Sequence, residues 1–144
     1  MKYLLDSNVI SELRKRPQKM DARVLEWAKN IDLSECFLSS ISVLEIEMGI
    51  LLLAKRDAEQ AGHLRQWFES DVLVKFHWRI LPVDVDVARE AARLHVPNPS
   101  PQMDALIGAT ASVNGCTLVT RNARDFENFE LDVINPWDIE ISQA

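Results

Sequence analysis

Acidic and amide side chains follow the apolar runs that predict β-strands in this sequence. Asp6 comes directly after the first run, and Glu45 follows the second at a short distance. Asp104 opens the helical segment before the last run, and Asn122 and Asp125 follow that run. In a doubly wound sheet, ligands bind beyond the carboxyl ends of the strands, because loops and helix N-termini converge there. The five side chains are therefore expected to point at one crevice.

Converging carboxylates predict a metal site. Several of them within a few ångströms repel one another strongly unless a divalent cation compensates their charge. Ligation by oxygen alone favours a hard ion such as Mg²⁺ or Mn²⁺. Other chemistries have little support, because His63, His77 and His95 show no metal-ligand spacing and no serine or cysteine lies in a nucleophile motif.

Each acid also has an ordinary structural explanation. Asp6 can cap a helix that starts near Ser7, while Glu45 and Asp104 can be acids that complement helix dipoles. The apolar neighbours of Glu45 and Asp104 in the sequence favour a functional role, since a charge among buried residues needs a partner. Gly49 is open to two interpretations, a packing glycine or a point where another backbone comes close to the site.

The spacing of apolar residues predicts strands that alternate with helices, hence a parallel sheet covered on both faces. Strands are expected at 2–5, 36–40, 79–84 and 116–120, and helices at 7–15, 21–30, 42–56, 57–76, 85–95 and 102–115. The helices at 42–56 and 57–76 are expected to form a hairpin. Ser40 or Ser42 is expected to cap the first of them, which places Glu45 in or near its first turn.

The composition is typical of one globular domain. The 144 residues are 47% apolar and 26% charged without a shift along the chain, so a single domain over 1–144 is expected. The net charge of −6 argues against nucleic-acid binding by bulk charge. No apolar run is long enough to span a bilayer and no signal-peptide pattern is present, which predicts a cytoplasmic protein without membrane contact. Cys36 and Cys116 are expected to be core thiols.

Four blocks of sequence, in order, carry a resemblance to a known family: "YLLDSNVISEL", "SSISVLEIEMG", "QMDALIGATA" and "LVTRNARDF", with "NPWD" near the C-terminus. They resemble the PIN-domain ribonucleases, in particular the VapC and FitB-like toxins of bacterial toxin–antitoxin pairs. The resemblance runs over nearly the whole chain. It implies an α/β fold, a three-layer α/β/α sandwich with a central, mainly parallel sheet, and a metal site built from acidic residues.

The resemblance also implies an activity, that of a Mg²⁺-dependent endoribonuclease that cleaves RNA phosphodiesters with a metal-activated water. Position by position, the family's acids fall on Asp6, Glu45 and Asp104, which are expected to hold the ion. The fourth position is open between Asn122, which brings no charge, and Asp125. The alternative for Asp125 is to cap the short helix in which it stands.

Residues near the fourth position are candidates for substrate binding. Thr120 and Arg121, at the end of the strand 116–120, are expected to bind the scissile or an adjacent phosphate, with Asn8 as a further hydrogen-bonding residue. For Arg121 the alternative is an ordinary surface arginine.

The resemblance further implies a homodimer and a small cognate antitoxin. The apolar stripe 50–53, with Trp67 and Phe68, is a candidate for that contact, and burial in the core is its alternative. Two other functions stay open: a housekeeping RNA-processing nuclease of the same fold, and a binding module that has lost catalysis, which the neutral Asn122 suggests.

Overall fold

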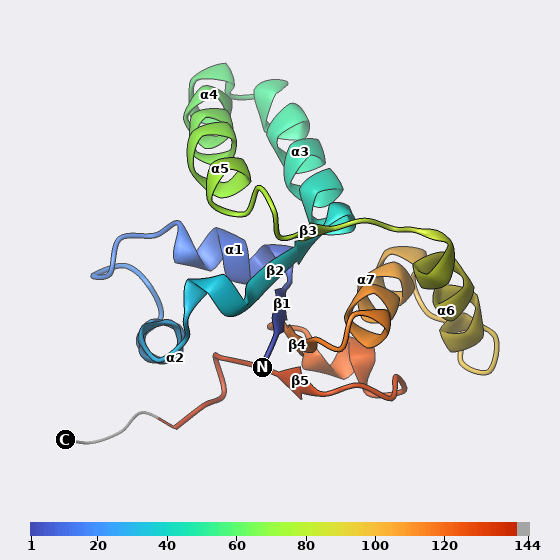
Figure 1. Cartoon of the computed structure of the whole chain (residues 1–144). Coiled ribbons are helices and arrows are strands. Elements are labelled where there is room, and N and C mark those ends of the chain that lie inside the picture. The colour runs from blue at the N-terminus through green and yellow to red at the C-terminus, as the bar shows by residue number, and fades with distance from the viewer. Residues whose placement is uncertain (141–144) are drawn as a thin grey trace.

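A five-stranded sheet runs through the middle of the molecule (Figure 1). In the computed structural model, which describes residues 1–140, neighbouring strands are parallel and their order is β3-β2-β1-β4-β5. The strands are β1 (Tyr3–Leu5), β2 (Cys36–Ser39), β3 (Ile80–Leu81), β4 (Thr117–Val119) and β5 (Val133–Ile134). Because every strand points the same way, all the carboxyl ends meet at one edge of the sheet.

Helices connect the strands and lie on both faces of the sheet (Figure 1). They are α1 (Ser7–Leu13), α2 (Ala22–Lys29), α3 (Ser40–Ala54), α4 (Ala58–Trp67), α5 (Leu73–Lys75), α6 (Val85–His95) and α7 (Gln102–Val113). Short 3₁₀ turns stand at Leu33–Glu35 and Ala123–Phe126, and a π-helical turn at Phe68–Val72 joins α4 to α5. Gly115, with φ 66°, follows α7 as the predicted helix stop.

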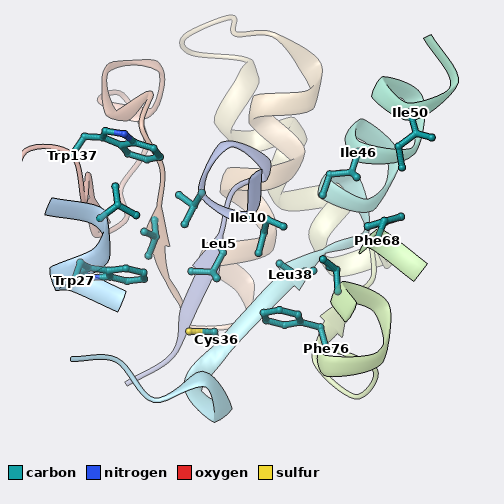
Figure 2. Close-up of a cluster of buried hydrophobic side chains, with 14 residues drawn as sticks. Leu5, Ile10, Trp27, Cys36, Leu38, Ile46, Ile50, Phe68, Phe76 and Trp137 are labelled. Atoms are coloured by element: carbon teal, nitrogen blue, oxygen red, sulfur yellow. The ribbon is translucent and has the colours of Figure 1, made fainter. Parts of the chain in front are cut away.

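The core divides into two clusters, because successive side chains of a strand point to opposite faces. Leu5 belongs to the cluster that Figure 2 shows, together with buried residues of α1, α2 and α3. Leu4 belongs to the other cluster, with buried residues of α6 and α7. The sheet therefore lies between two helical layers, and the predicted α/β/α sandwich is confirmed.

The start of α3 differs from the prediction. Ser39 caps this helix, since its side-chain oxygen accepts a hydrogen bond from the Ile41 N–H at 3.0 Å. The cap predicted at Ser40 or Ser42 is wrong, because β2 ends in an extended residue, Ser39, whose side chain already satisfies the first turn. The helix consequently begins at Ser40, and Glu45 lies in its second turn rather than its first.

α3 and α4 pack side by side as the predicted hairpin, and Figure 1 shows them with α5 above the sheet. The apolar stripe of α3 is divided between two environments. Ile50 and Phe68 are buried in the core, whereas Leu51 and Leu52 are 56% and 59% exposed. Burial in the core therefore holds for one part of the stripe, while the antitoxin contact stays a prediction for the exposed part.

Cys36 and Cys116 are buried and not disulfide-bonded, as predicted, and burial raises the pKa of the Cys36 thiol to about 11. No helix within residues 1–140 has the length and apolar character needed to cross a membrane. The single domain expected over 1–144 includes residues 141–144, which lie outside the described residues, and it stays a prediction.

Candidate active site

Asp6 occupies the turn between β1 and α1. Its backbone N–H donates to the Val119 carbonyl at 2.9 Å, which continues the pairing of β1 with β4. Its Oδ1 accepts from the Ser7 N–H at 2.8 Å and caps α1, while Oδ2 accepts from the Thr120 hydroxyl at 2.8 Å. The capping role and a place in the site thus coexist, because the two carboxylate oxygens point to different partners.

Glu45 is held beside Asp6 by a residue that sequence reasoning missed. The Ser7 hydroxyl donates to Glu45 Oε1 at 3.3 Å, which links the first turn of α1 to α3. Ser7 directly follows Asp6 in the sequence, and this position is the feature from which its role at the site could have been predicted. The bond brings Glu45 to the same edge of the sheet as Asp6.

The pKa values of the acids show that they share one electrostatic environment. Burial raises the pKa of Asp6, and the charge of Asp125 adds to the effect while hydrogen bonds to the carboxylate oppose it. Burial also raises the pKa of Glu45, with further contributions from the charges of Asp6 and Asp104. The pKa of Asp104, in the first turn of α7, is raised by burial and then by Asp125 and Asp6. The charges of Asp6, Asp104 and Asp125 thus act within one region, and Glu45 is affected by Asp6 and Asp104.

These acids stand apart rather than in a closed cluster. Among residues 1–140, no three His, Cys, Asp or Glu side chains are gathered as a group that could hold a metal ion. Carboxylates at closer range would need compensating charge. The donor set nevertheless fits a hard divalent cation, because it consists of carboxylate oxygens whose charged forms are disfavoured by burial and by one another.

Asn122 and Asp125 take different places at the fourth position. Asn122 precedes the 3₁₀ turn 123–126, and its N–H donates to the Thr120 hydroxyl oxygen at 3.1 Å. Asp125 lies inside this turn, so the alternative that it caps the helix is wrong. Its charge reaches the carboxylates of Asp6 and Asp104. Both residues are exposed, and Asp125 is the one whose charge acts on the other acids.

Thr120 does not fit the predicted contact with substrate. It is fully buried, and its hydroxyl is engaged with Asp6, so no substrate reaches it. Asn8 ties the neighbouring loop to α1: its Nδ2 donates to Thr120 Oγ1 at 3.4 Å, and its Oδ1 accepts from the Arg121 N–H at 3.2 Å. The Arg121 side chain is exposed, with its guanidinium 5.1 Å from the centre of the Trp137 ring.

A cavity of about 330 Å³ opens beside the acids, and its lining includes Glu45, Asn8, Asn122, Trp67 and Gly49. A Cβ atom on Gly49 would meet no atom within 4 Å. Gly49 is therefore not a packing glycine, and no described backbone comes close to it. The site thus consists of acids at one edge of the sheet with an open, partly apolar cavity next to them.

Together these features define a class of protein, an α/β/α sandwich with an acidic site at the carboxyl edge of a parallel sheet. The model of the PIN-domain family matches residues 3–130, and the chain belongs to the PIN-domain family.

Relatives and a solved structure agree with that assignment over nearly the whole chain. Toxin FitB of Neisseria gonorrhoeae is 36% identical over 141 residues, which cover 93% of this chain and 97% of the relative. VapC ribonuclease Y4jK of Sinorhizobium fredii is 35% identical over 144 residues, covering 94% and 97%. The crystal structure of FitAcB from Neisseria gonorrhoeae superposes with a TM-score of 0.84 at 32% identity, covering 95% of this chain and 99% of that one.

Proposed function

We propose that this protein is a divalent-metal-dependent endoribonuclease and the toxin of a toxin–antitoxin pair. The observation that carries the proposal is the electrostatic coupling of Asp6, Glu45, Asp104 and Asp125 at the edge of the sheet. Such coupling marks a site arranged for a cation. Relatives that bear the names toxin and ribonuclease, at 35% to 36% identity over almost the full length, support the same activity.

Asp6, Glu45 and Asp104 would hold Mg²⁺ or Mn²⁺. A bound divalent ion lowers the pKa of water and offsets the charge that develops on a phosphodiester during hydrolysis. Asp6 and Asp104 present the oxygen ligands, and Glu45 completes the set or orients the attacking water. Asp125 adds negative charge near both aspartates.

The groups that contact RNA differ from those that hold the ion. Arg121 is exposed beside the acids and carries a fixed positive charge, so it suits a phosphate. Asn122 offers an amide at the rim of the cavity, and Asn8 keeps the Arg121 backbone in place. Thr120 acts on Asp6 instead of on substrate.

Exposed apolar residues on α3 support a protein partner. Leu44, Met48, Leu51 and Leu52 are between 41% and 59% exposed, and their spacing places them along one face of the helix. A patch of this kind is typical of an interaction surface. A small antitoxin is the partner that fits the proposed function, and a homodimer remains part of the same proposal.

Cleavage of RNA by the purified protein, freed from any antitoxin, tests the activity. We expect cleavage with Mg²⁺ or Mn²⁺, none with EDTA, and none from Asp104→Asn, which keeps the size of the side chain but removes its charge. The matched control is Asp86→Asn, an exposed acid in the first turn of α6 away from the site. Absence of cleavage with every metal would contradict the nuclease and leave RNA binding without catalysis as the surviving function.

Expression in cells separates a toxin from a housekeeping nuclease. The wild type is expected to arrest growth, Asp104→Asn is not, and co-expression of the small protein encoded next to it is expected to relieve the arrest. Harmless overexpression of a protein that cleaves RNA in vitro would favour the housekeeping alternative.

A further inference from the structure

A second cavity, of about 380 Å³, shares Asn122 with the first. Asn122 lines both cavities, and the second is also lined by Arg121, Arg124, Asp125, Asn135 and Asp138. The first cavity contains Glu45 and Trp67 and no basic residue, whereas the second contains two arginines together with two aspartates. A ligand that contacts both cavities would therefore meet guanidinium groups in the second cavity alone.

The C-terminal residues 135–138 fix the position of Arg121. Asn135 Nδ2 donates to the Arg121 carbonyl and to Asp138 Oδ2, each at 3.1 Å, and its Oδ1 accepts from the Trp137 N–H at 2.9 Å. Trp137 is buried against the core cluster, where Figure 2 shows its ring at one end. The Arg121 guanidinium lies over this ring. Backbone and side chain of Arg121 are thus held by the same short segment.

Both arginines of the second cavity keep their charge available. Arg65 pairs with Glu47 and Glu69, but neither Arg121 nor Arg124 forms an ion pair in the part of the chain that the structure describes. Asp138, which shares the cavity, accepts the Asn135 amide. An arginine over an indole ring retains N–H donors for an anion.

We propose that the second cavity is a subsite for the RNA backbone, in which Arg121 and Arg124 bind phosphates that flank the cleaved bond. The strand passes Asn122, the residue that the two cavities share, and the Trp67 cavity receives the part of the strand that lies away from the arginines. Asn135 and Trp137 are positioning residues that act through Arg121. This inference rests on the proposed ribonuclease function and adds the direction in which the substrate extends. The inference also explains how a chain with a net charge of −6 would bind RNA, since two specific arginines, and not an overall positive charge, make the contacts.

The salt dependence of RNA binding tests the subsite. The Asp104→Asn protein, expected not to cleave, is titrated with a short single-stranded oligoribonucleotide at several salt concentrations. For single strands, each phosphate contact adds about 0.7 to the slope of log K against log salt. Arg124→Ala in this background is expected to reduce the slope by about 0.7 and to weaken binding about tenfold at low salt. Arg89→Ala, an exposed arginine of α6, is the matched control and is expected to leave both unchanged.

Two further variants separate charge from position. Arg121→Lys keeps the charge but loses the planar group over Trp137, and it is expected to retain the slope while binding more weakly. Asn135→Ala is expected to do the same, with a larger change in KM than in kcat when placed in the cleaving protein. A slope unaltered by Arg124→Ala in the folded Asp104→Asn protein, together with normal cleavage by the Arg124→Ala single variant, overturns the subsite and leaves the ribonuclease intact. A wild type that cleaves no RNA overturns the proposed function instead.

Discussion

The Thr120 hydroxyl donates a buried hydrogen bond of 2.8 Å to Asp6 Oδ2, between residues 114 positions apart in the sequence. This bond joins the ends of β1 and β4 through side chains, next to the backbone bond from Asp6 to Val119. It lowers the pKa of a carboxyl group that burial raises. Thr120 therefore helps to keep Asp6 ionised, which any role as a cation ligand requires.

Replacement of Thr120 by valine tests this relationship. Thr120→Val preserves the shape but leaves Asp6 without its donor, so we expect a loss of about 1–2 kcal/mol in the free energy of unfolding. The pKa of Asp6 rises further, and the acidic limb of the pH–rate profile for RNA cleavage is expected to move to higher pH. Thr120→Ser keeps the hydroxyl and serves as control. Identical pH profiles for the two variants would show that the bond has no influence on Asp6.

Neutralising one acid is expected to stabilise the metal-free protein. Asp104→Asn removes a charge whose ionised form is disfavoured by burial and by Asp125 and Asp6, so the Tm in EDTA should rise by roughly 2–4 °C. Asp6→Ala should instead lose about 1 kcal/mol, because it removes the cap of α1. Thermal unfolding of both variants provides the comparison. A lower Tm for Asp104→Asn than for the wild type would mean that its carboxylate makes a stabilising contact.

The pH dependence of stability follows from the same raised pKa values. Asp6, Glu45 and Asp104 bind protons more tightly in the folded state than in the unfolded chain, where their pKa values are near 3.8 and 4.5. Their contribution to stability is therefore greatest at low pH and falls as the pH rises through the raised values. The difference in free energy of unfolding between wild type and Asp104→Asn should grow across this window in EDTA.

Saturating Mg²⁺ should reduce that difference, because an ion that binds only the folded state stabilises it by mass action. At 100 times its Kd the stabilisation is about 2.7 kcal/mol. Urea unfolding with and without Mg²⁺ measures the effect. An equal response of the wild type and Asp104→Asn to Mg²⁺ would contradict ion binding at these acids.

Gly49 and Gly108 differ in the space around them, so alanine substitutions at the two positions are expected to change stability in opposite directions. A Cβ atom on Gly49 meets nothing within 4 Å, so Gly49→Ala should stabilise α3 by about 1 kcal/mol. A Cβ atom on Gly108, in α7, would lie 2.5 Å from Phe129 Cδ2, and Gly108→Ala should destabilise the protein by about 1–3 kcal/mol. Chemical denaturation measures both. Destabilisation by Gly49→Ala would reveal a constraint on the backbone at the cavity wall.

The strand-end acids could be predicted from the sequence because their positions depend on local patterns. An apolar run followed by an acid places Asp6 and the edge of the sheet without knowledge of long-range contacts. The cap of α3 could not be predicted, since Ser39, Ser40 and Ser42 have the same propensity and only the end of β2 selects among them. Thr120 is buried instead of contacting substrate because β4 packs against β1, and this contact too could not be predicted from local sequence.

The contacts of Arg121 could not be predicted from the sequence for the same reason. Asn135 and Trp137 lie in the motif that the sequence singled out, but nothing local indicates that they contact Arg121, which lies 14 positions before Asn135. Their role depends on β5 pairing beside β4, which brings the two segments together. The positions of β1 to β4 followed from periodicity, but β5 was not predicted, and the helix expected at 57–76 is interrupted by the π-helical turn Phe68–Val72. The partners of individual polar side chains depended on tertiary packing.

The separation between Asp6 and Thr120 also matters while the chain is being made. A ribosome must add 114 further residues after Asp6 before the hydroxyl that steadies it exists, and the brace on Arg121 comes later still. Pairings between residues so far apart in the sequence slow folding, because the loop between them must close first. A nascent or prematurely ended polypeptide thus has the first acids but lacks the hydrogen bond that holds Asp6.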